Sequence, residues 1–105
     1  MRKEIEEQIK ELKEVTALKD SLVKLEKNKD FQKVIFQNYF DKEPTRLTMI
    51  RPSIKTENLP HIDDAFKAVG LLKLFFDMVL NKGEQAETEI AKLTEELNNL
   101  DGEEI

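Results

Sequence analysis

The residues with the clearest capacity for chemistry are one histidine and two nearby carboxylates. His61 is the chain's single histidine, and Asp63 and Asp64 follow it closely. A histidine oriented by a carboxylate can act as a general acid or base. Pro60 precedes the group, however, as it would in the first turn of a helix, where carboxylates also stabilise the free amides and the helix dipole. We therefore interpret these residues as a helix start and predict no catalytic residue.

The sequence contains no motif for a metal site, a cysteine nucleophile, a phosphate-binding loop or a serine nucleophile. One histidine and scattered carboxylates lack the spacing of metal ligands, so we predict no metal site. Cysteine is absent, which excludes disulfides, thiolate ligands and a cysteine nucleophile. There is no glycine-rich phosphate loop and no nucleophile-elbow motif. We expect no cofactor and no enzymatic activity.

One segment is locally basic in an otherwise acidic chain. Its cations are Lys42, Arg46, Arg51 and Lys55. They are candidates for contact with phosphate or with an acidic protein surface, and an ordinary solvated loop is the simpler interpretation. The whole chain carries 17 Lys and Arg against 22 Asp and Glu, a net charge of −5. Nucleic acid is therefore expected as a partner only through this segment, because phosphate binding requires cations.

Two long helices are predicted to position these groups. In the first, apolar residues recur at steps of three and four, the spacing of one helix face. They are Ile5, Ile9, Leu12, Val15, Leu18, Leu22 and Leu25. Two successive steps of three, from Leu12 to Leu18, predict a departure from a regular supercoil. Asn28 or Asp30 is predicted to cap a new helix. That helix begins at Phe31, and its apolar residues predict burial on more than one side.

Glu43-Pro44 is predicted to end the first arm, since a residue before proline avoids the α conformation. A second helix is predicted over residues 60–100, with Gly83 as a weak point. Its apolar stripe is Ile62, Phe66, Val69, Leu72, Phe76, Val79, Ala86, Ile90, Leu93, Leu97 and Leu100. Each arm has a narrow apolar stripe flanked by charge at its outer end and an aromatic-rich segment at its inner end. If the chain folds back at the elbow, the two aromatic-rich segments pair with each other and so do the two narrow stripes.

We therefore predict an all-α fold: an elongated antiparallel helical hairpin with coiled-coil-like arms and a proline-containing elbow. It is a single domain over residues 1–105, with a first arm at 1–42 that breaks near 28–30. The elbow is 43–59, the second arm is 60–100, and 101–105 is a frayed tail. Whether the arms pair within one chain or between chains stays open.

The excess of aromatic residues predicts an interface. A two-helix hairpin has no third layer that would cover six phenylalanines and one tyrosine. The predicted contact residues of the arms and of the aromatic region are Leu12, Leu18, Leu22, Leu25, Phe31, Ile35, Tyr39, Phe66, Leu72, Phe76, Ile90, Leu93 and Leu97. The expected partners are proteins: further copies of the chain, a larger assembly, or both.

Residues 17–35, followed by Tyr39-Phe40 and Arg46-Leu47, resemble small helical proteins found among the virion and assembly genes of tailed bacteriophages. The resemblance implies a virion component or assembly factor with no catalytic residues. We expect a non-enzymatic structural or assembly component that oligomerises or docks on a larger complex. The alternative is a small acidic inhibitor or adaptor that binds a basic surface of a host or phage enzyme. The expected location is the virion or host cytoplasm, with no signal peptide and no membrane span.

Overall fold

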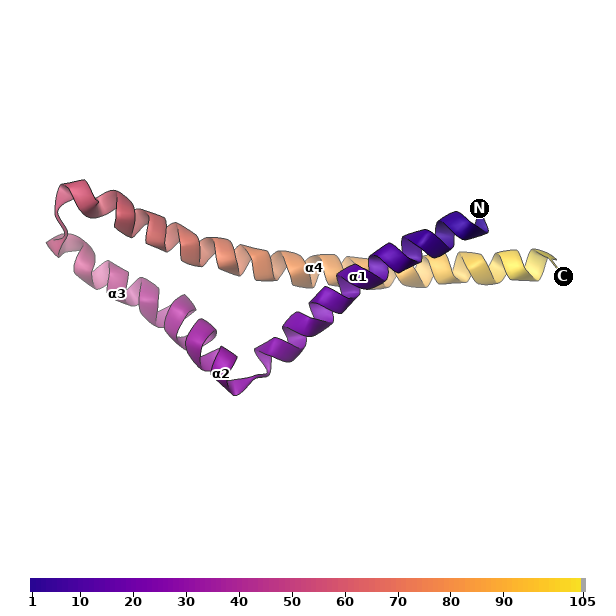
Figure 1. Cartoon of the computed structure of the whole chain (residues 1–105), viewed down its shortest axis with the longest axis horizontal. Helices are drawn as coiled ribbons and strands as arrows, with labels where there is room; N and C mark the ends of the chain where they lie inside the picture. The colour runs from indigo at the N-terminus through magenta and orange to yellow at the C-terminus, as the bar shows by residue number, and fades with distance from the viewer. Residues whose placement is uncertain (105) are drawn as a thin grey trace. The chain divides into compact units, whose positions relative to one another are not determined.

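The computed structural model describes the backbone of residues 1–104 and the side chains of residues 1–102. Over these residues the chain is helical without strands, so the predicted all-α fold is confirmed (Figure 1). The elements in chain order are α1 (Arg2–Glu26), α2 (Lys29–Phe31), the π-helix η1 (Gln32–Lys42), α3 (Glu43–Ile50), the 3₁₀ turns η2 (Arg51–Ser53) and η3 (Thr56–Asn58), and α4 (Leu59–Glu104).

The expected single domain over residues 1–105 divides into two compact units. Unit 1 joins residues 1–23 to residues 78–105, and unit 2 comprises residues 24–77. Each unit therefore contains its own pairing between an early segment and part of α4, which is the helical-hairpin relation expected from the sequence.

The inward face of α4 follows a regular heptad pattern, because its covered residues alternate steps of three and four. They are Val69, Leu72, Phe76, Val79, Gly83, Ala86, Ile90, Leu93, Leu97 and Leu100, all buried or half-buried. Gly83, predicted as a weak point, lies inside α4, which continues unbroken through it. The tail that is expected to fray from Asp101 is helical to Glu104, and Ile105 lies outside the described residues.

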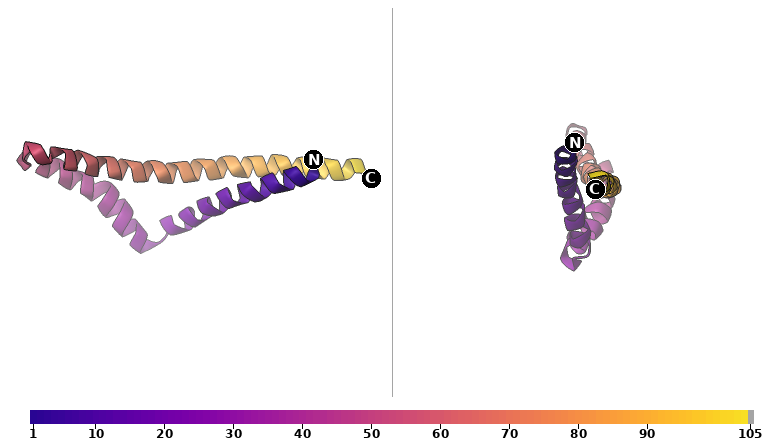
Figure 2. Two further views of the ribbon diagram at one scale, coloured as in Figure 1. Left: turned by 45° about the horizontal axis from the view of Figure 1, so that its top comes forward. Right: turned by 90° about the vertical axis from the view of Figure 1, so that its right-hand side faces the viewer.

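In unit 1, α1 lies antiparallel beside the C-terminal part of α4 (Figure 2). Lys19 Nζ donates a 2.8 Å hydrogen bond to Glu87 Oε1, and Arg2 pairs with Asp101. The buried and half-buried residues of α1 in this unit include a line with alternating steps of four and three: Ile5, Ile9, Leu12, Thr16, Lys19 and Val23. The half-buried Val15 and the buried Leu22 lie beside this line. Leu18, the last residue of the predicted run with two steps of three, lies outside this line, and the departure from a regular supercoil stays a prediction.

Two of the predicted α1 contact residues, Leu18 and Leu25, are 53% and 44% exposed. The half-buried Thr16 and Lys19 occupy the inward positions instead. The reason lies on α4: a Cβ atom built on Gly83 would lie 2.3 Å from Lys19 Cβ and 2.5 Å from its Cδ. The absence of a side chain at Gly83 thus leaves room for the lysine stem, whose ammonium reaches Glu87.

In unit 2, the predicted break near residues 28–30 is confirmed, because α1 ends at Glu26 and α2 begins at Lys29. Asn28 is the N-cap, and its Oδ1 accepts a 3.0 Å hydrogen bond from the Phe31 amide. The Gln32 side chain donates a 2.7 Å hydrogen bond to the Glu26 carbonyl. A side chain therefore satisfies one backbone group at each end of this break, the Glu26 carbonyl and the Phe31 amide.

The aromatic segment continues as a π-helix, in which backbone hydrogen bonds connect residues five apart. The Glu43 amide donates to the Asn38 carbonyl, and the Asn38 side chain donates to the Lys33 carbonyl. This wider turn brings Phe31 and Phe36 onto one face, which an α-helix would separate. Their ring centroids are 5.3 Å apart.

The predicted end of the helix at Glu43-Pro44 is wrong. Pro44 lies in the first turn of α3, a position that its fixed φ angle suits, and the chain remains in α conformation through Ile50. The elbow therefore begins later than residue 43. Ile54 and Lys55 have extended ψ angles of 136° and 142°, and α4 begins at Leu59 with Pro60 in its first turn, as predicted.

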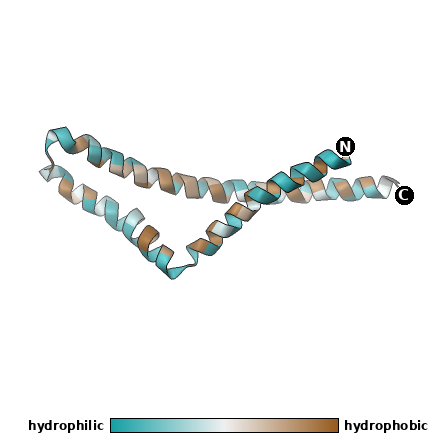
Figure 3. Ribbon diagram, in the orientation of Figure 1, coloured by the Kyte–Doolittle hydropathy of each residue, from teal (hydrophilic) through white to brown (hydrophobic). Residues whose placement is uncertain are grey.

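The most buried side chains lie outside the aromatic segment. η1 contains no buried residue, and Val34 is 59% exposed, so the prediction of burial on more than one side is wrong. The buried apolar residues are Ile5, Leu22, Val79, Ala86 and Leu93 in unit 1, with Leu47 and Val69 in unit 2. Hydrophobic residues recur along α1 and α4 between hydrophilic ones, as amphipathic helices require (Figure 3).

Candidate interaction surfaces

The predicted contact residues fall into three classes of exposure. Leu22 and Leu93 are buried, and Leu18 and Leu25 are exposed. The rest are half-buried: Leu12, Phe31, Ile35, Tyr39, Phe66, Leu72, Phe76, Ile90 and Leu97. Most of the predicted set thus helps to pack the chain's own helices and leaves only part of each side chain for a partner.

Phe31, Phe36, Phe40 and Phe76 form an aromatic cluster in unit 2. Phe76 of α4 lies between two rings of the other segment, with centroid distances of 5.9 Å to Phe31 and 5.7 Å to Phe40. Phe36 stacks on Phe40 at 5.8 Å, and Lys73 Nζ lies 5.3 Å from the centre of the Phe40 ring. None of the chain's aromatic side chains, all within the described residues, is fully buried. The cluster joins α4 to η1 without a third layer over it.

Unit 2 also exposes an apolar surface on α4 that the site prediction omitted. We call Leu71, Leu74 and Phe75 the α4 patch, and these side chains are 65%, 63% and 48% exposed. They lie on a different side of the helix from the inward residues Val69 and Leu72. The sequence indicates this surface, because the apolar residues of α4 form a stripe wider than one heptad line. Such a width predicts a second apolar face on the helix.

Unit 1 contains a shallow groove between α1 and α4. Its lining residues are Gln8, Glu11, Leu12 and Val15 of α1 with Glu89 and Leu93 of α4. An adjoining hollow shares Leu12, Val15 and Glu89 and adds Lys82, Gln85 and Ala86. The groove therefore has an apolar floor and polar rims. Only Leu12 and Leu93 of its lining were predicted as contact residues.

All four predicted basic contact residues are exposed. Arg46 Nε donates a 3.0 Å hydrogen bond to Glu43 Oε2, which lowers the pKa of Glu43 and raises the pKa of Arg46. Arg51 Nε lies 3.5 Å from Asp63 Oδ1. Two of the cations, Arg46 and Arg51, thus have acidic partners within the chain, which leaves Lys42 and Lys55 as the remaining exposed cations of that segment. This arrangement weakens the case for a phosphate-binding surface.

The pairing of Arg51 with Asp63 also bears on the histidine group. Asp63 contacts the arginine, and His61 is exposed in the first turn of α4. Among the described side chains of residues 1–102, no three histidine, cysteine or carboxylate groups gather closely enough to hold a metal ion. In the same part of the chain, no helix combines the length and the apolar character needed to cross a bilayer.

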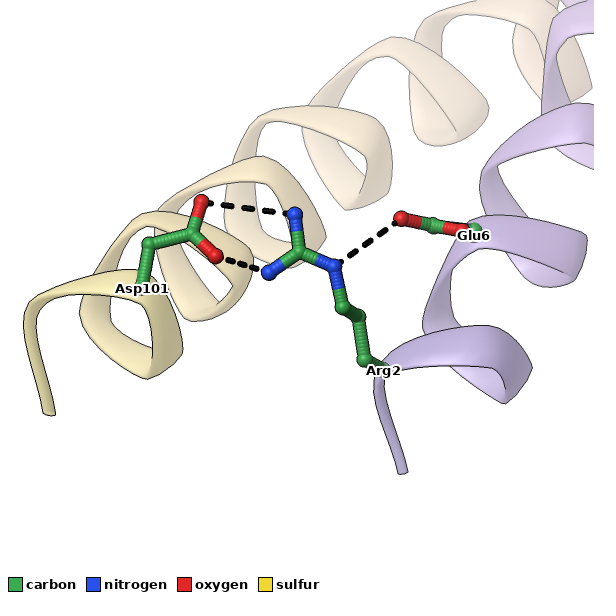
Figure 4. A network of polar contacts seen from close by, with 3 residues as sticks. All are labelled: Arg2, Glu6 and Asp101. Carbon is green, nitrogen blue, oxygen red and sulfur yellow. Dashed lines mark hydrogen bonds and ion pairs between the residues drawn. The ribbon is translucent and has the colours of Figure 1, made fainter. Parts of the chain in front are cut away.

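The outer end of unit 1 has a small polar network (Figure 4). The Arg2 guanidinium contacts both Asp101 oxygens and donates a 3.2 Å hydrogen bond to Glu6 Oε1. Arg2 and Asp101 are each about half exposed, at 46% and 48%, so their pairing contributes about 1 kcal/mol or less. The network joins the two termini of the unit and offers no reactive group.

Comparison with protein-family models, curated proteins and solved structures finds no match.

Proposed function

We propose that the chain is a non-enzymatic structural or assembly component that self-associates or docks on a larger complex through exposed helix faces. The observation that carries the proposal is the α4 patch, in which Leu71, Leu74 and Phe75 are each about half exposed or more. Contiguous exposed apolar residues of this kind mark interaction sites.

The size of the patch limits the kind of contact. Even if each of these side chains were as large as a fully buried aromatic residue, at most about 250 Å², the exposed parts of the three would supply no more than roughly 440 Å². A standard interface buries about 800 Å² from each partner. A partner must therefore extend along the helix beyond the patch, as another helix would.

The resemblance of residues 17–35 to small proteins of tailed bacteriophages supports placing this role in a phage particle or its assembly. The second candidate function is an acidic inhibitor or adaptor. It is favoured by the charge of unit 1, in which residues 1–23 and 78–105 hold seven Lys and Arg against fourteen Asp and Glu. Binding to a basic surface would weaken steeply with added salt, whereas apolar self-association would not.

Light scattering after size exclusion, repeated across protein concentration, tests self-association. We expect a discrete oligomer for the wild type and a monomer for Leu71→Gln/Leu74→Gln. The matched control is Ala17→Gln/Ala91→Gln, which adds two glutamines at exposed helix positions away from the patch and should retain the oligomer. A wild-type monomer that also leaves a hydrophobic dye unbound would overturn the proposal.

A further inference from the structure

We propose that the groove of unit 1 binds a basic amphipathic helix from a different protein. This inference rests on the proposed docking role and names the partner's chemistry. The groove offers Leu12 and Val15 of α1 opposite Ala86 and Leu93 of α4. A channel between two antiparallel helices, with an apolar floor, is where the apolar face of a third helix packs.

The spacing of the groove residues along each helix fits a helical occupant. On α1, Val15, Leu18 and Leu22 follow one another at steps of three and four. Leu22 is buried against the chain's own helices, so Val15 and Leu18 are the apolar residues that this side of α1 offers to a partner. On α4, Met78, Lys82, Gln85 and Glu89 recur at the same steps, and Met78 is 41% exposed. A partner helix with apolar residues three and four apart would therefore meet side chains at every turn.

Charge identifies the occupant. Glu11 of α1 and Glu89 of α4 both line the part of the groove that contains Leu12 and Leu93, and both are exposed. Lys82, which lines the adjoining hollow, is the one cation among the lining residues. Unit 1 as a whole has a net charge of −7. A second copy packed groove to groove would bring two such charges together, whereas a lysine- or arginine-rich helix would be attracted, most strongly at the Glu11 and Glu89 end.

The test uses the full chain and two synthetic helical peptides. Both have leucines at heptad positions; one carries lysines at the remaining positions and the other carries glutamates. Binding is measured by fluorescence anisotropy. We expect saturable binding of the lysine peptide, none of the glutamate peptide, and affinity about tenfold weaker for Val15→Ser, because an apolar side chain is lost from the contact. The matched control, Ala91→Ser on the opposite side of α4, should bind as the wild type.

A second pair of variants tests the charges. Glu11→Gln/Glu89→Gln should weaken binding of the lysine peptide and reduce its dependence on salt. Asp20→Asn/Glu95→Gln removes the same charge from exposed positions outside the groove and should do neither. Equal losses in both double variants would overturn the inference, because attraction would then be general to the acidic surface.

The remaining outcomes separate this inference from the proposed function. Binding that survives Val15→Ser but is lost in Leu71→Gln/Leu74→Gln would assign the peptide to the α4 patch, which refutes the groove and keeps the docking role. A wild-type oligomer that dissociates in Val15→Ser would make a second copy the occupant and overturn the charge argument. Absence of both peptide binding and self-association would remove both proposals.

Discussion

Substitution of Gly83 by alanine should destabilise the protein, although alanine is the better helix former. In an open helix position the change would stabilise by about 1 kcal/mol. Here the added Cβ would lie 2.3 Å from Lys19 Cβ and 2.5 Å and 2.7 Å from Cδ and Cγ, so α1 must move away from α4. Overpacking of this kind costs about 1–3 kcal/mol, which leaves a net loss of up to about 2 kcal/mol.

The chain supplies its own control, because nothing lies within 4 Å of a Cβ built on Gly70. Gly70→Ala should therefore stabilise by about 0.5–1 kcal/mol. Urea denaturation followed by far-ultraviolet circular dichroism measures both changes. Adding Lys19→Ala to Gly83→Ala should recover part of the loss, since the Cγ and Cδ contacts disappear. Equal stabilisation by Gly83→Ala and Gly70→Ala would refute the close approach of the two helices.

Two further predictions concern α1. Leu22→Ala should cost about 2–4 kcal/mol in urea denaturation, because Leu22 is 7% exposed. Leu18→Ala should cost less than about 1 kcal/mol, since that side chain is 53% exposed, and equal costs would place Leu18 in the packed face after all. The hydrogen bond to Glu87 raises the pKa of Lys19 above its usual 10.5, so the pair's contribution is complete below that pH and is lost as pH rises through the raised pKa. As pH rises from neutrality, the stability gap between wild type and Lys19→Met should therefore shrink only above pH 10.5, and a gap that is already closed near neutral pH would contradict this origin.

Local signals predicted several elements correctly. Pro60 as a first-turn residue and a cap at Asn28 or Asp30 were predicted from the sequence, because both signals depend on backbone groups within a few positions. The structure shows that Asn28 is the cap. The inward line of α4 was predicted for the same reason, because apolar residues at regular steps define one face wherever the partner lies.

The residues of α1 that pack inward could not be predicted from α1 alone, because they depend on the opposing residues of α4. Counting apolar residues favoured Leu18 and Leu25, yet Thr16 and Lys19 are inward. A lysine stem fits there because Gly83 leaves space on the opposing helix. No periodicity within α1 reveals that space, since it belongs to the pairing of two segments.

The aromatic segment shows a different limit. The sequence predicts a helix end at Pro44, yet a proline also fits the first turn of a helix, which is where Pro44 lies. The conformation of the preceding backbone determines which of the two occurs, and the proline itself does not reveal it. The steps of five and four from Phe31 to Phe36 and Phe40 were an available signal of the wider π turn. The groove was less accessible to sequence, because its two walls come from opposite ends of the chain.

The small residue at Gly83 also determines which alignment of α1 and α4 is allowed. A heptad helix pair can in principle slide by seven residues and still match apolar positions. Such a shift would bring Lys19 opposite Ile90 in one direction or Phe76 in the other, and neither leaves room for the lysine stem. It would also separate the ammonium from Glu87. One glycine and one lysine thus select a single register, so mispaired hairpins are disfavoured during folding even though the remaining seam is repetitive.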